Sequence, residues 1–284
     1  MARPAEHDIL FEPVQVGPKR LRNRFYKAAH GTRFGVERPR RQASFRGMAA
    51  EGGWAAVHTD LCSIHPESDN TPNAVCRLWD EEDVRSLSLM CDAVHEHGAL
   101  AGVELWYGWA HARNLETRVA ARGVSQIPSD LAWTQSCYAV DRDEIRELRG
   151  FYAAAARRAV SAGFDIATVY AAHGHAITQQ FLKPHYNRRT DEYGGFEYGG
   201  SLANRARFLR ETVEEVREAI GDRCAVAVRL CLDSLRPRGI DVDDAAEVVE
   251  LLDGLVDLWD FTVGSVVAPV GRGHAVLALC RRAL

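Results

Sequence analysis

The chain has 284 residues, of which 46% are hydrophobic and 26% are charged, and its formal net charge is −4. This composition is typical of a globular protein with a large core, in one large domain or two small ones, and it excludes disorder as the main state. The slight acidity provides no basic surface for nucleic acid or an anionic membrane, and the sequence predicts neither a membrane span nor a signal peptide. We therefore expect a cytoplasmic protein with no nucleic-acid or membrane partner.

Six apolar, β-rich runs alternate with amphipathic segments along the chain, which is the pattern of parallel βα units. The predicted strands are residues 24–29, 54–62, 100–106, 164–170, 224–230 and 258–263. The predicted helices are residues 44–50, 81–97, 142–162, 201–220 and 243–255. At the start of the third helix, Asp141 and Glu144 have the spacing of a capping box.

This order of elements predicts an α/β fold, a TIM (β/α)8 barrel that is truncated after about six strands. A doubly wound open sheet is the competing fold, and it is disfavoured because no glycine-rich dinucleotide fingerprint follows the first strand. The residues after Gly264 include no Asp or Glu and are too few for two more βα units. We expect residues 1–264 to form an incomplete barrel domain and residues 265–284 to form a divergent tail.

The clearest functional signal begins with the apolar run 164–170, which has the character of a strand buried on both faces. Tyr170, His173 and His175 stand at its carboxyl end, where parallel α/β folds place their chemistry. The polar segment that follows is longer than an ordinary strand-to-helix connection. Loops of this length in compact domains are usually functional or disordered, and we expect this one to be functional.

Tyr170 and His173 are three residues apart, so a turn can bring both side chains into one pocket. A tyrosine hydroxyl with a lowered pKa, assisted by an imidazole, can act as a general acid or base near neutral pH. A buried tyrosine beside a capping histidine is the alternative, and the spacing does not decide between them. His173 and His175 also fit a two-histidine metal site, but no metal is expected because the later strands end without further ligands, and the seven cysteines lack metal-ligand spacing.

Two charged residues stand inside otherwise apolar strands, Glu104 in 100–106 and Arg229 in 224–230. Burying either is costly unless it meets an opposite charge. An ion pair between the two is one interpretation, and a polar cofactor such as an electron-rich heterocycle is the favoured one. The first strand ends in Ala28, Ala29, His30 and Gly31. A flat ring could approach the backbone at these residues, or they could simply pack a narrow barrel mouth.

With these residues, the sequence resembles the flavin-dependent Old Yellow Enzyme superfamily, and specifically its trimethylamine and dimethylamine dehydrogenase branch. The resemblance spans about residues 1–264 and is carried by HDILFEPVQVGPKRLRNRFY (7–26), EGGWAAVHTDLCSIHPESD (51–69), GALAGVELWYG (98–108), GFDIATVYAAHGH (163–175) and QFLKPHYNRRTDEYGG (180–195). It implies a TIM barrel that holds FMN at the carboxyl ends of its strands.

The resemblance also implies roles for individual residues. Residues 28–31 would line the flavin, and Glu104 and Arg229 would contact its ring. Tyr170 and His173 match the Tyr and His of the family's active-site triad, which assist oxidation of a small amine bound over the flavin. Hydride or its equivalent would pass from the substrate carbon to the flavin.

Several positions depart from that branch. Trimethylamine dehydrogenase attaches its flavin through a cysteine where this chain has Gly31, so the FMN is expected to be noncovalent. Leu61 replaces a tyrosine of the aromatic substrate bowl, which argues against trimethylamine as the substrate. The family's triad Asp, its phosphate-binding strands and its iron-sulfur cysteines would lie beyond Gly264, so an iron-sulfur cluster is not expected in this chain.

The main hypothesis is therefore an FMN-dependent oxidoreductase resembling the amine dehydrogenases, with a small-molecule substrate. One alternative is a truncated, non-catalytic remnant, because an unclosed barrel exposes strand edges. The other is an NAD(P)H-dependent enoate reductase, which shares most of these residues. The resemblance leaves a homodimer open.

Overall fold

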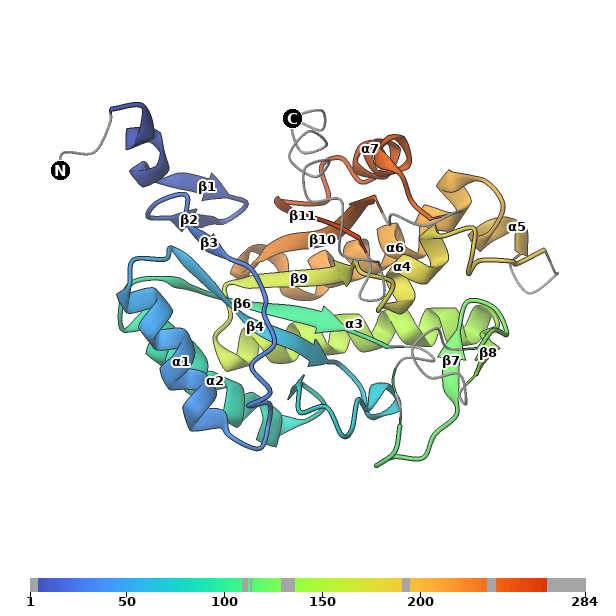
Figure 1. Cartoon of the computed structure of the whole chain (residues 1–284), viewed down its shortest axis with the longest axis horizontal. Coiled ribbons are helices and arrows are strands. Elements are labelled where there is room, and N and C mark those ends of the chain that lie inside the picture. Colours follow the sequence, from blue (N-terminus) through green and yellow to red (C-terminus); the bar gives the residue numbers. More distant parts are fainter. Residues whose placement is uncertain are drawn as a thin grey trace.

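A computed structural model describes residues 5–108, 112, 114–128, 136–190, 195–233 and 239–264. A parallel sheet forms its centre, with the strand order β11-β10-β9-β6-β4-β3 and with β5 paired to β4 beside this path (Figure 1). The strands of the sheet are β3 Tyr26–Lys27, β4 Ala56–Ser63, β5 Cys76–Arg77, β6 Leu100–Trp106, β9 Ile166–Ala171, β10 Ala225–Asp233 and β11 Leu258–Val263. Two further pairs of short strands are β1 Val14–Val16 with β2 Lys19–Leu21, and β7 Ala121–Gly123 with β8 Cys137–Ala139.

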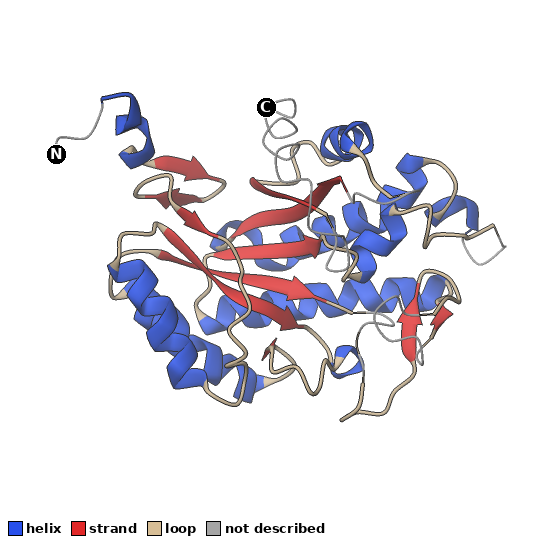
Figure 2. Ribbon diagram, viewed as in Figure 1, coloured by secondary structure: helices blue, strands red, loops and turns tan. Residues whose placement is uncertain are grey.

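The helices lie along the outside of the sheet. Neighbours α1 and α2, α2 and α3, α3 and α6, and α6 and α7 contact each other in turn, and they cover the sheet on one face (Figure 2). The α-helices are α1 Pro39–Glu51, α2 Glu81–His95, α3 Arg142–Ala162, α4 Ile177–Leu182, α5 Gly195–Tyr198, α6 Leu202–Ile220 and α7 Val242–Leu251. The 3-10 helices are η1 Ala5–Phe11, η2 Pro66–Ser68 and η3 Gly221–Arg223.

The order of the main strands in space is their order in the chain, and every neighbouring pair is parallel. The strand order of a doubly wound sheet reverses at a switch point, and no reversal occurs here among the described strands. The predicted α/β fold is thus confirmed as a curled half-barrel, an incomplete TIM-type barrel with β3 and β11 at its two edges. The predicted tail, 265–284, lies outside the described residues.

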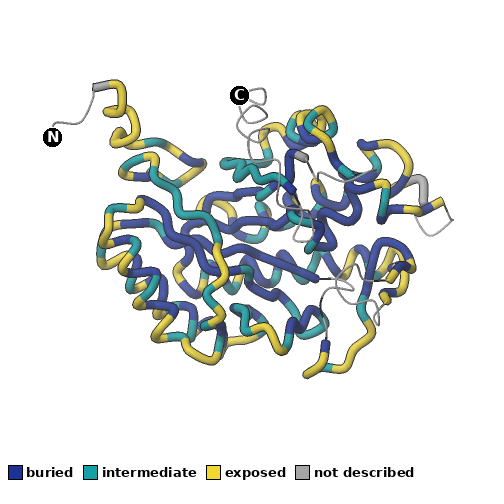
Figure 3. Tube along the Cα trace, viewed as in Figure 1, coloured by how far each residue is buried: buried dark blue, intermediate teal, exposed yellow. Residues whose placement is uncertain are grey.

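Alternate residues of each strand face the helices and the concave side. In β9, Ala167 and Val169 belong to the core beneath the helices, whereas Tyr170 belongs to a separate cluster at the carboxyl end. In β10, Val228 and Leu230 face the helices in the same way. The central strands are mostly buried, while the outer faces of the helices are exposed (Figure 3). The side chains that face the concave side of the sheet, such as Tyr170, are therefore the ones that can build a site.

The β1–β2 hairpin covers the amino ends of the strands. Its Val16 and Leu21 pack against Ala56, Ile166 and Ala225, one or more from each of three main strands. Polar residues at the opposite, carboxyl ends of the strands are consequently the ones that can reach a ligand.

Helix boundaries follow capping residues. The predicted capping box of α3 is present, with the Asp141 carboxylate accepting from the Glu144 amide, and Gly163 ends the helix with a φ of 97°. Helix α1 begins earlier than the predicted residue 44, because Pro39 is well suited to a first turn. The first predicted strand is shorter than expected, since only Tyr26–Lys27 pair with β4. No helix in the described ranges combines the length and apolar character of a membrane span.

Asp165 joins several elements at the amino end of β9. Its carboxylate accepts hydrogen bonds from Lys19 Nζ (2.9 Å), His95 Nε2 (2.7 Å) and the Ala101 amide (3.0 Å). Burial raises the pKa of Asp165, but these hydrogen bonds outweigh it and the net pKa is lowered, whereas the hydrogen bond to Asp165 raises the pKa of His95. Both shifts mark a favourable charged pair.

We expect Asp165→Asn to lower the free energy of unfolding by about 2 kcal/mol, because the charge-assisted hydrogen bonds weaken. A lowered pKa makes the contribution of Asp165 present above about pH 4 and lost on acidification, and a raised pKa makes that of His95 present below about pH 6.5 and lost as pH rises. The difference in free energy of unfolding between parent and variant, measured with urea, should therefore be largest between about pH 4 and about pH 6.5. The exposed Asp253→Asn is the matched control, and an equal effect of both variants would contradict the assignment.

Candidate active site

A cavity of about 330 Å³ opens at the carboxyl ends of β4, β6, β9 and β10. Seven of the eight residues predicted from the sequence line it, and Ala28 does not. Those that line it are Ala29, His30, Gly31, Glu104, Tyr170, His173 and Arg229. Leu61, the residue that departs from the aromatic bowl, lines it too. The structure therefore brings together segments that lie far apart in the sequence.

Arg229 is the centre of the charged part of the cavity. Its Nη1 donates to Glu104 Oε2 (3.0 Å) and to the Ala29 carbonyl (3.1 Å), and its Nε lies 3.5 Å from Asp260 Oδ2. The side chains of Glu104 and Asp260 are mostly buried. The ion pair between Arg229 and Glu104, one of the two interpretations of the sequence, is therefore present. Because both residues line the cavity, the pair is compatible with a ligand there.

The three charges perturb one another. Burial raises the pKa of Glu104 to about 7, although Arg229 opposes the shift. Burial raises the pKa of Asp260 as well. For Arg229, burial lowers the pKa, but Glu104 and Asp260 outweigh it and the net pKa is raised. Near neutral pH the guanidinium is charged, and Glu104 can either donate or accept a hydrogen bond.

Tyr170 and His173 form a hydrogen-bonded pair, as one of the two sequence alternatives requires. The Tyr170 hydroxyl lies 2.6 Å from His173 Nδ1, and His173 Nε2 lies 2.9 Å from Thr262 Oγ1 of β11. His173 has a φ of 57°, and this left-handed turn directly after β9 folds its ring back toward Tyr170. The pair is therefore fixed at one end by β9 and at the other by β11.

The pKa expected for Tyr170 was wrong in direction. Burial, followed by the charge of Glu104, raises its pKa well above the usual value. Burial and the charge of Arg229 lower the pKa of His173 to about 4. At neutral pH the hydroxyl thus keeps its proton and the imidazole is neutral, so we assign Tyr170 as donor to Nδ1 and Nε2–H as donor to Thr262.

His175 also lines the cavity, and burial lowers its pKa. Its backbone carbonyl accepts a hydrogen bond from Trp106 Nε1 (2.6 Å), which fixes the turn after β9. Within the described ranges, no group of three His, Cys, Asp or Glu side chains is placed to hold a metal ion.

The segment after β3 runs along the cavity with its backbone held from both sides. Arg46 Nη2, from α1, donates to the His30 carbonyl (2.6 Å), and Arg229 donates to that of Ala29. A Cβ added to Gly31 would meet no atom within 4 Å. Open space therefore adjoins the backbone at the position where the sequence predicted the approach of a flat ring.

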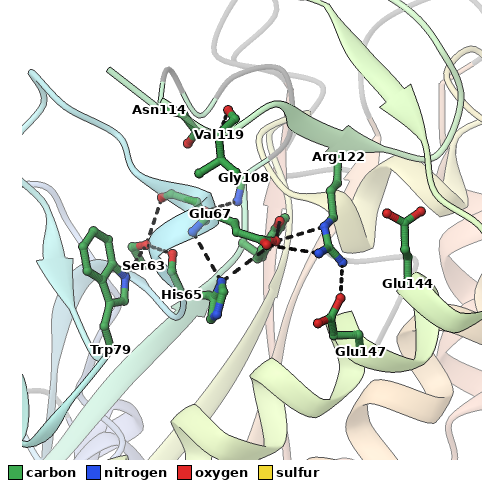
Figure 4. Close-up of polar contacts among 12 residues, drawn as sticks. Ser63, His65, Glu67, Trp79, Gly108, Asn114, Val119, Arg122, Glu144 and Glu147 are labelled. Carbon is green, nitrogen blue, oxygen red and sulfur yellow. Dashed lines mark hydrogen bonds and ion pairs between the residues drawn. The ribbon is translucent and has the colours of Figure 1, made fainter. Parts of the chain in front are cut away.

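Another wall of the cavity comes from residues 70–75, between β4 and β5. Glu67, just before it, accepts from Arg122 Nε (2.9 Å) and Nη2 (3.0 Å), and Arg122 Nη1 donates to Glu147 Oε2 (2.6 Å; Figure 4). Asp69 accepts from the amides of Thr71 and Glu116, both at 2.8 Å. The wall is thus tied to β7, to α3 and to the segment around residue 116, and it is held in one position.

Sequence reasoning missed several residues of the site, namely Arg33, Asp60, Asn70, Asn73, Asp260 and Thr262. Asp260 gives the same signal as Glu104 and Arg229, a charge between apolar residues of a strand, and could have been found by it. Arg33 and the 70–75 wall reach the cavity through irregular segments, which have no periodicity to reveal their direction.

This chain is similar to a protein-family model, to characterised proteins and to solved structures. The model of the NADH:flavin oxidoreductase / NADH oxidase family matches residues 9–274. Dimethylamine dehydrogenase of Hyphomicrobium sp. (strain x) is 43% identical over 274 residues, which are 94% of this chain and 36% of that protein. The structure of histamine dehydrogenase from Rhizobium sp. 4-9 has a TM-score of 0.87 and 39% identity, covering 92% of this chain and 38% of the other. Morphinone reductase in complex with tetrahydroNAD has a TM-score of 0.75 and 25% identity, covering 89% and 73% respectively.

Proposed function

Because this chain belongs to the NADH:flavin oxidoreductase / NADH oxidase family, we propose that it holds FMN noncovalently in the cavity and oxidises a small amine there. The family membership confirms the resemblance noted in the sequence. The chain spans only 36% of the dimethylamine dehydrogenase it matches, so the activity, substrate and partners of a whole protein are part of the proposal. The convergence of Glu104, Arg229, Tyr170 and His173 on one cavity is the observation that supports it most.

The residues present fit the ring of a flavin. The cavity size is within the range of small-molecule sites, roughly 300–1,000 Å³. Arg229 Nε makes no hydrogen bond within the described residues, and Glu104 can act as donor or acceptor, so polar ring atoms would find partners here. The open space beside Gly31 admits a flat group against the backbone without a covalent link.

The residues of the chain would then have two separate roles, binding the flavin and accepting the proton of the amine. FMN supplies an acceptor for the two electrons and the hydrogen that leave the substrate carbon. Arg229 and Glu104 orient the ring, and the Tyr170 hydroxyl, donating to His173, keeps lone pairs for an N–H of the amine. As the carbon–nitrogen double bond forms in the substrate, the amine proton passes to Tyr170 and the hydroxyl proton to His173 Nδ1. The balance would be two electrons and one hydrogen accepted by the bound flavin, and one proton kept by the Tyr170–His173 pair.

The experiment is to add FMN to the purified chain, remove unbound flavin, and follow the visible flavin absorption without oxygen. We expect a yellow protein that dimethylamine bleaches. Bleaching by NADH or NADPH but not by amines, with recovery on adding a conjugated enone, would favour the enoate reductase instead. A protein that stays colourless would favour a non-catalytic remnant, a reading supported by the edges β3 and β11, each with one neighbour among the described strands.

Two further assignments belong to this proposal. Residues 1–264 would be the flavin-binding domain, and limited proteolysis of the FMN-loaded chain should protect them. A homodimer would show as twice the chain mass in size-exclusion chromatography with light scattering.

A further inference from the structure

A second cavity shares the wall formed by residues 70–75, and the function proposed above gives it no role. This outer cavity has a volume of about 370 Å³, within the range of small-molecule sites, and its lining includes Glu37, Asp69, Glu116 and Arg77. Residues 70 and 73–75 line both the outer cavity and the active-site cavity. A molecule bound in the outer cavity would therefore border the active-site cavity through the residues that both share.

Two irregular segments are held against this wall. The first is the segment after β3, where Gly35 has a φ of 47° and an added Cβ would lie 2.7 Å from the Val75 carbonyl oxygen, so only glycine allows the approach. The second is the segment around residue 116. There the Asn114 amide donates to the Asp69 carbonyl (3.0 Å), and the Glu116 amide donates to the Asp69 carboxylate (2.8 Å). The lining is thus held in place before any ligand arrives.

Carboxylates dominate the charge of the lining. Asp69 is buried, and its carboxylate accepts hydrogen bonds from three backbone amides, those of Thr71, Glu116 and Thr117. Burial raises the pKa of Asp69, but these hydrogen bonds outweigh it and the net pKa is lowered, so the carboxylate is charged. Glu37 is exposed and has no ion pair among the described residues. Glu37 and Glu116 both keep acceptor positions for a ligand.

Arg77 is the one guanidinium among the described lining residues, and it is already engaged. Its Nε lies 3.6 Å from Asp83 Oδ1, its Nη1 lies 4.0 Å from Glu116 Oε1, and its Cζ lies 4.5 Å from the centre of the Trp79 ring. Trp79 is fixed in turn, because its Nε1 donates to Ser63 Oγ (2.9 Å; Figure 4). Since negative groups outnumber this shared positive one, the outer cavity favours a cation.

Asn70 supplies the buried hydrogen-bonding group of the outer cavity. It is 6% exposed and lines the cavity, yet neither its amide oxygen nor its amide nitrogen has a partner among the described residues. Burying an amide without a partner is costly unless a ligand or water satisfies it. The backbone at this position is fixed, since the Asn73 amide donates to the Asn70 carbonyl (2.8 Å). The side-chain oxygen of Asn70 is therefore available to an N–H donor of a bound cation.

We propose that the outer cavity is a second binding site, for a small alkylammonium ion whose N–H groups donate to the Asn70 amide oxygen and to the carboxylates of Glu37 and Glu116. An organic cation is favoured over a metal ion, because no group of three His, Cys, Asp or Glu side chains in the described part of the chain is placed to hold one. The inference goes beyond the proposed function, since binding here needs neither flavin nor the Tyr170–His173 pair.

The test is calorimetric titration of the chain, with and without added FMN, using ethylammonium and its uncharged counterpart ethanol. We expect ethylammonium to bind in both samples and ethanol to give no measurable binding. Glu37→Gln, Glu116→Gln and Asn70→Ala should each weaken ethylammonium binding by about fivefold, the factor of one exposed charge pair or one hydrogen bond. Glu218→Gln, which removes an equal charge from an exposed position of α6 outside both cavities, should leave the affinity unchanged.

Glu37 and Glu116 line the outer cavity and not the active-site cavity, so their variants identify where the ion binds. Full affinity in both variants would place the ion elsewhere and overturn the proposal, as would a parent that does not bind ethylammonium or an equal loss in Glu218→Gln. Urea unfolding checks that Glu37→Gln keeps the stability of the parent. A parent that takes up no flavin would refute the proposed function, whereas ethylammonium binding would still decide on this site.

Discussion

Replacement of Tyr170 by Phe is expected to slow the reduction of the bound flavin by an amine by about 10²- to 10⁴-fold, the usual contribution of a general acid–base group. The variant lacks the hydroxyl that lies 2.6 Å from His173 Nδ1, so the amine proton has no acceptor in contact with the imidazole. Rapid mixing of the oxidised, FMN-loaded chain with dimethylamine, followed by flavin absorption, measures the rate. The affinity for FMN should change little, because Glu104 and Arg229 remain.

Tyr26 offers a matched control for this substitution. Its hydroxyl is also hydrogen-bonded to a histidine, His58 Nε2 at 2.9 Å, but Tyr26 packs against the cluster at the amino ends of the strands and does not line the cavity. Tyr26→Phe removes the same atom with a comparable structural cost and should leave the rate of flavin reduction near that of the parent. If the two variants slow the reaction equally, Tyr170 acts through packing and its assignment to proton transfer is wrong.

Replacement of Arg229 by Met is expected to lower the free energy of unfolding by about 3 kcal/mol, because Glu104 and Asp260 lose the cation they share. It should also weaken FMN binding by about 10- to 100-fold through the loss of charged hydrogen bonds. Urea unfolding measures the first effect without flavin, and a flavin titration measures the second. The double variant Arg229→Met/Glu104→Gln should recover part of the stability, since one unpaired carboxylate is then absent, but not the FMN affinity.

The same variant carries a prediction about pH. Folding raises the pKa of Glu104 from 4.5 to about 7, so the protonated carboxyl is favoured in the folded state. Its stabilising contribution is complete below about pH 4.5 and is lost as pH rises through about 7. Without Arg229 the pKa rises further, so the instability of Arg229→Met should be larger at about pH 8.5 than at about pH 6. If Arg229→Met loses the same free energy of unfolding at both pH values, the pKa of Glu104 does not depend on Arg229.

Much of the fold could be predicted because its main elements carry local signals. Every main strand is an apolar run, and the ends of helices such as α3 are marked by capping residues, here Asp141 and Gly163. The β1–β2 hairpin and the β7–β8 pair were not predicted, since strands of three residues are too short for a period to appear. The bounds of β3 were wrong because only two of its residues find a partner in β4.

Site residues could be predicted where a charged or proton-transferring side chain stands inside an apolar strand or at its end. Glu104 and Arg229 are charges inside apolar strands, and Tyr170 and His173 follow a strand at its carboxyl end, so their convergence could be expected from parallel topology. The direction of the Tyr170 pKa could not, because it depends on how completely the residue is buried and on the nearness of Glu104. Arg33 and Asn70 could not be found either, since their place depends on the contact of two irregular segments at Gly35.

The bond between Arg229 and the Ala29 carbonyl joins residues 200 positions apart. A nascent chain can therefore complete this contact only after Arg229 has been synthesised, and until then the first βα units must hold together without it. If the chain holds FMN as proposed, flavin loading is consequently a late step, because the coenzyme can select molecules that have made this contact but cannot guide their early assembly.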